Sequence, residues 1–85
     1  MVNLLINSDG VKHYRDIFDK YHRLNGPAYI SKGLKQWIYN GHYHRSNGPA
    51  VEYENGYKLW YYNGKHIICD TQEKFERLIK LSVLW

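Results

Sequence analysis

The feature that most constrains the fold of this 85-residue sequence is a phrase that occurs twice. Residues Tyr21–Ala28 recur as Tyr43–Ala50 with one change, 22 positions later, and Trp37–Gly41 recurs as Trp60–Gly64, 23 positions later. The two shifts differ by one residue, so the extra residue falls between the Pro-Ala pair and the tryptophan, in a turn where it leaves strand register intact. An internal repeat of this length predicts a small array of similar units, at about residues 21–42 and 43–65.

The glycines indicate what each unit contains. There are 7 glycines, of which five follow Asn and one follows Asp, and from Gly26 onward they recur every seven or eight residues. Asn-Gly supplies the two positive φ angles of a type I′ hairpin turn. We therefore predict an antiparallel β-hairpin meander of about eight or nine short strands, with one further turn, free of glycine, around residues 16–19.

Turn geometry also predicts which side chains share a face. A two-residue turn at Asn40-Gly41 places Trp37, Tyr39, His42 and His44 on one face. It places Gln36, Ile38, Tyr43 and Arg45 on the other. The same rule at Asn55-Gly56 groups Val51, Tyr53, Lys58, Trp60 and Tyr62.

The C-terminal segment changes period. Asp70 and Glu73 are typical of a helix start, as N-cap and reciprocal cap, and Phe75, Leu78 and Ile79 follow at helical spacing. We predict an amphipathic helix over about residues 71–82 and an apolar tail, Leu81 to Trp85, that tucks under the sheet or contacts a second chain. The fold class is mainly β (α+β), as a single domain over residues 1–85.

Composition excludes several classes of protein. With 1 cysteine, Cys69, the chain has no internal disulfide and no cysteine-based zinc finger. It has neither an apolar run of about 18 residues nor the features of a secretory signal, so we expect no membrane contact and a cytoplasmic location.

Charge placement points to an anionic partner. The formal net charge is +4, and no carboxylate side chain occurs between Asp19 and Glu52. Single-stranded nucleic acids bind basic grooves that also offer rings for base stacking. These two properties predict an RNA-binding surface made of Lys20, Arg23, Lys32, Lys35, Tyr39, His42, Tyr43, Arg45, Lys58 and Lys65.

Several of these residue types also have a structural interpretation. Trp37 and Trp60 recur at repeat spacing, which favours a place in the core between units. His22 and His44 recur too, which favours hydrogen bonds to an Asn-Gly turn or packing on a ring. The pair His42 and His44 lacks a third metal ligand at useful spacing, so we expect no metal site and no cofactor. Repeated residues rarely form a unique catalytic site, so we expect no enzymatic activity.

The repeated His-Arg-x-x-Gly-Pro-Ala phrase, followed by Trp-x-Tyr-Asn-Gly, resembles MORN-like repeat segments of bacteriophage and large-virus proteins. The resemblance covers residues 21–64, although standard MORN repeats are richer in glycine, and it implies a hairpin array of viral origin. The size, basicity and aromatic content are similar to those of small phage factors that bind RNA and neutralise a host toxin endoribonuclease.

The resulting expectation is a non-catalytic RNA-binding protein, encoded by a phage and active in the host cytoplasm against a toxin–antitoxin ribonuclease. Its expected partners are RNA, the host toxin ribonuclease and a second copy of itself as a dimer, because open sheet edges need covering. The alternative is a protein–protein interaction module that inhibits a host protein through its aromatic sheet or its C-terminal tail. Interfaces favour Tyr, Trp and Arg just as RNA sites do, so composition leaves both alternatives open.

Overall fold

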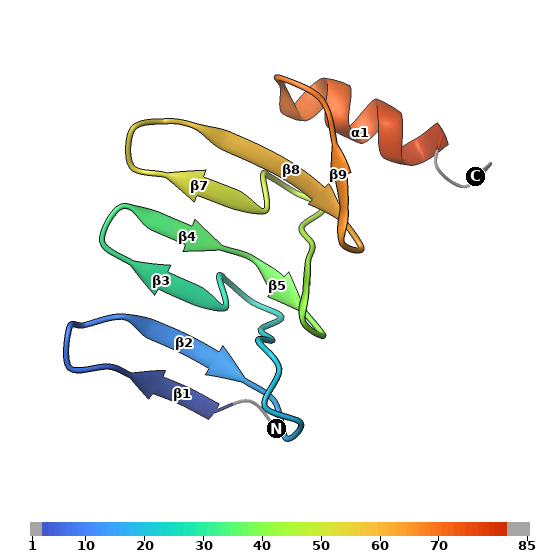
Figure 1. The fold of residues 1–85 in the computed structure, drawn as a ribbon. Coiled ribbons are helices and arrows are strands. Elements are labelled where there is room, and N and C mark those ends of the chain that lie inside the picture. The colour runs from blue at the N-terminus through green and yellow to red at the C-terminus, as the bar shows by residue number, and fades with distance from the viewer. Residues whose placement is uncertain (1–2, 82–85) are drawn as a thin grey trace.

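The chain runs back and forth between two columns of β-hairpins, and a helix closes one end (Figure 1). The computed structural model describes residues 3–81. The nine strands are β1 (Asn3–Ile6), β2 (Lys12–Arg15), β3 (Tyr29–Ser31), β4 (Leu34–Gln36), β5 (Ile38–Tyr39), β6 (His42–Tyr43), β7 (Val51–Tyr53), β8 (Lys58–Tyr62) and β9 (Lys65–Ile67). The helix α1 spans Gln72–Leu81. The predicted fold class, a hairpin meander with a C-terminal helix, is confirmed.

One column contains the long hairpins β1–β2, β3–β4 and β7–β8, which join side by side in a 7-stranded sheet of order β1-β2-β3-β4-β7-β8-β9. The other contains short hairpins: the turn of residues 16–20, the β5–β6 pair and the β8–β9 pair. Each unit of the repeat is therefore one long hairpin followed by one short hairpin. The glycine-free turn predicted near residues 16–19 is confirmed, and Asp16 caps it by accepting hydrogen bonds from the backbone N–H groups of Phe18 and Lys20.

Backbone hydrogen bonds attach each unit to the next at equivalent positions. The N–H of Tyr14 donates to the carbonyl of Ala28, and that of Trp37 donates to Ala50. Both alanines are fully buried, because a small side chain lets neighbouring hairpins approach closely. The array measures 41 × 30 × 16 Å, so it is a thin slab in which few side chains are covered on both sides.

The largest buried cluster lies where α1 packs on the last hairpin. Trp60, Ile67 and Phe75 form it, and Leu78 and Ile79 pack against it, as the helical spacing predicted. Trp60 is only 6% exposed, which confirms its place in the core. Within residues 3–81, no helix is both long enough and apolar enough to span a bilayer.

The start of α1 differs from the prediction. The hydroxyl of Thr71 accepts a hydrogen bond from the N–H of Lys74, so Thr71 is the N-cap in place of Asp70. Lys74 then occupies the position where a reciprocal cap needs Glu or Gln, and Asp70 instead pairs with the Lys74 ammonium. The predicted tail beyond Leu81 lies outside the described residues.

The prediction of a two-residue turn at Asn55-Gly56 is wrong. Asn55-Gly56 belongs to a three-residue turn in which only Gly56 has positive φ, so Glu52 faces Lys58 and Val51 faces Leu59. This one-residue difference in register moves Lys58 and Trp60 to the face opposite Val51 and Tyr53. Asn40-Gly41 and Asn63-Gly64, with positive φ at both residues, are the two-residue turns that were predicted.

The pairs Asn25-Gly26 and Asn47-Gly48 are not hairpin turns. They lie in the segments that return the chain from a short hairpin to the next long one, where no strand is formed.

The predicted position of Arg45 is also wrong. The β5–β6 ladder ends at Tyr43, the chain then bends, and the guanidinium of Arg45 reaches the face that carries Trp37.

Candidate functional site

Three lysines occupy equivalent positions on one face of the long-hairpin sheet. The cross-strand register runs from Lys12 through Ile30 to Lys35, and from Lys35 through Glu52 to Lys58. Side chains directly opposite one another point to the same side of a sheet, so these lysines share what we call the basic face. All three are exposed. Successive members of this lysine row are two strands apart, which is about 10 Å.

The one carboxylate that lies between two lysines of the row is already paired with an arginine. Glu52 lies between Lys35 and Lys58, and its carboxylate accepts a hydrogen bond of 3.1 Å from the guanidinium of Arg45. None of the three lysines forms an ion pair with a carboxylate among residues 3–81. The row therefore presents three ammonium groups whose charges are not neutralised locally.

The arginines of the repeated phrase are held by the fold. The guanidinium of Arg45 lies 3.8 Å from the centre of the Trp37 ring and donates to the carbonyl of Pro49. The guanidinium of Arg23 lies 4.0 Å from the centre of the Tyr14 ring and donates to the carbonyl of Pro27. Each arginine thus joins an aromatic residue of one long hairpin to the segment that enters the next.

The glycine of the phrase makes room for this contact. A Cβ atom added at Gly48 would lie 2.7 Å from Cζ of Arg45, and one added at Gly26 would lie 3.0 Å from Cζ of Arg23. The guanidinium is therefore enclosed by a ring on one side and by glycine backbone on the other. This packing gives the Arg-x-x-Gly-Pro-Ala spacing a structural reason.

The histidines of the phrase hold the Asn-Gly turns, as predicted. The N–H of Asn40 donates to Nδ1 of His22, and the N–H of Asn63 donates to Nδ1 of His44, both at 2.9 Å. His22 also packs on Tyr39, and His44 packs on Tyr62. Burial lowers the pKa of His44 from its ordinary value, because burial disfavours the charged imidazolium.

An open groove of about 670 Å³ lies beside the two enclosed arginines, which line it. It lies between two successive return segments, with Arg23 to Gly26 on one side and His44 to Asn47 on the other, and Trp37 and Tyr39 complete its lining. No carboxylate of the described part of the chain lines it. Tyr39 is 42% exposed, so part of its ring is open to a ligand.

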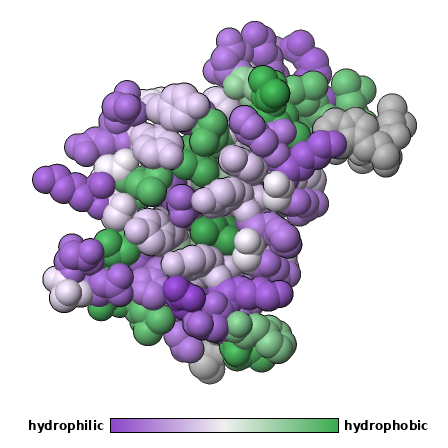
Figure 2. All heavy atoms as spheres, viewed as in Figure 1, coloured by the Kyte–Doolittle hydropathy of each residue, from purple (hydrophilic) through white to green (hydrophobic). Residues whose placement is uncertain are grey.

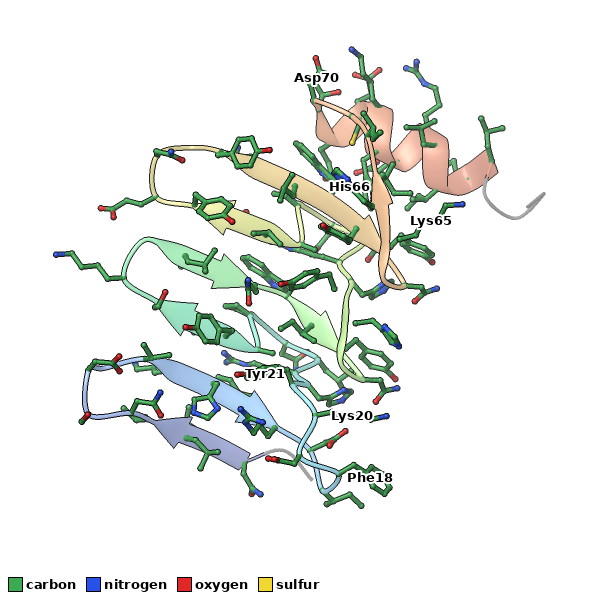
Figure 3. All side chains as sticks on the ribbon, viewed as in Figure 1. Phe18, Lys20, Tyr21, Lys65, His66 and Asp70 are labelled. Atoms are coloured by element: carbon green, nitrogen blue, oxygen red, sulfur yellow. The ribbon has the colours of Figure 1, made fainter. Side chains whose placement is uncertain are left out.

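Figure 2 shows the polar character of the surface around this array. Hydrophilic side chains gather along the edges that carry the hairpin turns, and side chains of intermediate hydropathy lie between them. Strongly hydrophobic side chains lie on the helix, near β1, on the central hairpins and at the turn that carries Phe18 (Figure 3). A polar surface that also offers rings suits a charged ligand with flat, stackable groups.

A second basic edge follows the turns of the short hairpins. Lys20, His42 and Lys65 hold equivalent positions there, just before the second strand or as its first residue, and Figure 3 shows Lys20 and Lys65 projecting from this edge. Lys20 lies beside the Gly41 turn, and His42 lies beside the Gly64 turn.

Apart from Tyr43, the predicted RNA-binding residues are therefore distributed over four places. Lys35 and Lys58 lie in the row; Arg23, Tyr39 and Arg45 line the groove; and Lys20, His42 and Lys65 lie at the short-hairpin edge. Lys32 is in the β3–β4 turn, at the opposite edge of the molecule.

Tyr43 faces away from the basic face. Its hydroxyl accepts a hydrogen bond from the Gln36 amide, and desolvation raises the pKa of Tyr43 from its ordinary value. The structure therefore separates Tyr43 from the other predicted residues.

The sequence prediction missed Lys12. The signal was present, because Lys12, Lys35 and Lys58 are each 23 residues apart and each stands two residues before Tyr14, Trp37 or Trp60. The repeat was identified from its longer phrases, which do not extend back to Lys12.

The chemistry available in this surface is that of binding. Among residues 3–81, no three side chains of the His, Cys, Asp and Glu types gather as a metal-ligand group. The basic face offers ammonium groups, enclosed guanidinium groups and partly open rings. Comparisons of the chain with known protein families, with curated proteins and with solved structures found no match.

Proposed function

We propose that this protein binds single-stranded RNA on its basic face and does so without catalysing a reaction. The observation that carries the proposal is the lysine row, in which Lys12, Lys35 and Lys58 repeat on one exposed face without a carboxylate partner among the described residues. Phosphate contacts from lysines give such binding most of its affinity.

The regular spacing of the row supports a polymer as the ligand. An array of equivalent cations about 10 Å apart matches a ligand that presents the same charged group again and again. Tyr39, in the neighbouring column, is 42% exposed and offers its ring to a base, and a stacked base contributes about 1–3 kcal/mol. Arg23 and Arg45 line the groove, but their guanidinium groups pack on aromatic rings, so their main role is structural.

The resemblance to small phage factors extends the proposal to a cellular role. RNA held on the basic face would bridge the protein to a host toxin ribonuclease or would compete for the RNA site of that enzyme. Either route would inhibit the toxin without a catalytic group in this chain.

Two matched triple variants test the RNA proposal. The first replaces Lys12, Lys35 and Lys58 with Gln, and the second replaces Lys74, Arg77 and Lys80 of α1 with Gln. Each lowers the formal net charge from +4 to +1, and the second removes charge away from the row, at residues of which Lys74 and Arg77 are paired with Asp70 and Glu73. Fluorescence anisotropy with a labelled single-stranded RNA should show a loss of binding in the first variant and near-normal binding in the second.

Salt dependence gives an independent measurement. Three phosphates neutralised on a single strand give a slope of log affinity against log salt of about −2.1, so a fourfold rise in salt weakens binding by about twentyfold. Equal losses in both triple variants would reduce the proposal to nonspecific charge attraction. Unchanged binding in the first variant would overturn it.

A further inference from the structure

The strand β1 forms a free edge of the 7-stranded sheet. Its apolar residues are unusually open for an edge: Leu4 is 47% exposed, Leu5 43% and Ile6 60%. The segment Asn3–Asn7 carries no charged residue and no proline, which are the usual means of preventing strands from pairing with an edge. The far end of the array is different, because α1 packs there on Trp60 and Ile67.

The alternation of hydrogen-bonded and non-hydrogen-bonded pairs along β1 and β2 shows which backbone groups of β1 face outward. The N–H of Tyr14 donates to Ala28 and its carbonyl accepts from His22, so both groups point away from β1. Leu4, which lies opposite Tyr14, therefore has its own N–H and carbonyl directed away from β2. The N–H of Asn7 bonds to Val11, and the alternation along the strand then makes Ile6 outward-facing as well.

We propose that β1 pairs with β1 of a second copy of this chain, antiparallel and centred on Leu5. Such a two-fold contact must place the segment against itself, and the pattern Asn-Leu-Leu-Ile-Asn is symmetric in polarity about Leu5. Leu4 then lies opposite Ile6, Asn3 opposite Asn7, and Leu5 opposite the second copy's Leu5.

The direction of the backbone groups and the symmetry of the sequence about Leu5 indicate the same register. The outward-facing groups of Leu4 and Ile6 are the ones that a pairing centred on Leu5 uses, and each Leu4–Ile6 pair exchanges two hydrogen bonds. Leu5 is left as the central pair without hydrogen bonds, where side chains come closest. The two sheets become continuous, and both copies present their lysine rows on the same side.

Cysteine pairs test the register directly. In a Cys69→Ser background, Leu5→Cys places two thiols across the two-fold axis, with Cα atoms about 4.5 Å apart, within the range of about 4.4–6.8 Å that a disulfide needs. Leu4→Cys is the matched control. In this register residue 4 faces residue 6 of the second copy, so the Cα atoms of the two residues 4 are about 8 Å apart. Mild oxidation should give a covalent dimer with Leu5→Cys and little with Leu4→Cys on a nonreducing gel.

Charge exchange at the axis gives a second test. Leu5→Lys and Leu5→Glu each place a charge opposite itself, so each protein alone should dimerise about tenfold more weakly in sedimentation equilibrium. An equimolar mixture of the two should recover the dimer, because Lys then lies opposite Glu.

Three results would overturn this proposal: a wild-type protein that is monomeric at about 100 μM, well above the micromolar range of weak complexes; equal cross-linking by the two cysteine variants; or a mixture that does not recover. Circular dichroism confirms that each variant is folded. The inference is independent of RNA binding, because these substitutions leave the lysine row intact and sedimentation is measured without RNA.

Discussion

Arg45 and Arg23 illustrate how single residues set the geometry of the repeat. Each guanidinium lies over a ring of one long hairpin and donates to a proline carbonyl just before the next. A cation on an aromatic face contributes about 0.5–2 kcal/mol, depending on how far the pair is removed from water. The identity of the arginine, the glycine and the ring is therefore determined together by packing.

This arrangement predicts the effect of one added methyl group. Gly48 has no positive φ, so alanine suits its backbone, but the new Cβ would lie 2.7 Å from Cζ of Arg45. Gly48→Ala should lower the free energy of unfolding by about 1–3 kcal/mol, as other overpacked sites do. Urea denaturation followed by circular dichroism measures the change.

An Arg45→Ala background provides the control for this prediction. Without the guanidinium, Gly48→Ala should cost less than about 0.5 kcal/mol, so the two substitutions should be strongly non-additive. Additive effects would mean that Gly48 is needed for a reason other than the arginine contact.

His44 predicts a pH dependence of stability. Burial lowers its pKa in the folded state, so the unfolded chain takes up a proton first as the pH falls below the ordinary value of 6.5. The contribution of His44 is complete above that pH and is lost as the pH falls through the lowered folded pKa. The lowered pKa values of Asp16 and Asp70 act only below about 4, in a separate range.

His44→Asn tests this assignment, because the amide oxygen of asparagine accepts a hydrogen bond but does not titrate. Urea denaturation at pH 7, 6 and 5 should show a shallower fall in unfolding free energy for the variant than for the wild type. Identical pH profiles would remove His44 as a source of the dependence.

The helix α1 depends on its first turn. Thr71 caps the N–H of Lys74, so Thr71→Ala should destabilise the protein by about 1 kcal/mol. Asp70→Ala removes only an exposed pair with Lys74 and should have a clearly smaller effect. Thermal unfolding of the two variants side by side distinguishes the two residues, and a larger loss from Asp70→Ala would reassign the cap.

Elements were more predictable than their registers. The hairpins, the helix stripe and the turn near Asp16 followed from spacing, because hydrophobic period and turn residues act locally. The register at Asn55-Gly56 did not follow, since a two-residue and a three-residue turn use the same dipeptide. The helix start was predicted at Asp70, but the hydroxyl of Thr71 accepts the hydrogen bond from the N–H of Lys74, so the cap lies one residue later.

The candidate site was only partly predictable for the same reason. Lys35 and Lys58 were identified from charge, but placing Lys58 on the face of Lys35 and Lys12 depends on the three-residue turn that was predicted to have two residues. The roles of His22 and His44 were predictable because they repeat with the turns that they hold. The enclosure of Arg45 by Trp37 and Gly48 was not, because it requires the bend that follows Tyr43.

At the scale of the molecule, stability comes from contacts between neighbouring units. The chain is a short linear array in which each unit bonds to the next through the same backbone groups, such as the Trp37–Ala50 bond and the Gly64–Tyr43 bond. The stability of such arrays is close to a sum of unit and interface contributions. The length of the array therefore also sets the length of the lysine row, because each unit adds one lysine.

This property predicts that the array can be extended. Inserting a second copy of residues 35–57 between Tyr57 and Lys58 adds one complete unit, since Lys35 and Lys58 are equivalent. The second junction is native, and the first differs from it by placing Gln36 where Leu59 stands. Because a repeat array gains an interface with each unit, the extended protein should melt at a higher temperature while α1 still closes its end. With four lysines in the row, the slope of log RNA affinity against log salt should steepen by about 0.7. Differential scanning calorimetry and anisotropy titrations measure both changes.

A folded, extended protein with an unchanged salt slope would separate the lysine row from RNA binding, whereas an extended protein that does not fold would show that the units are not interchangeable.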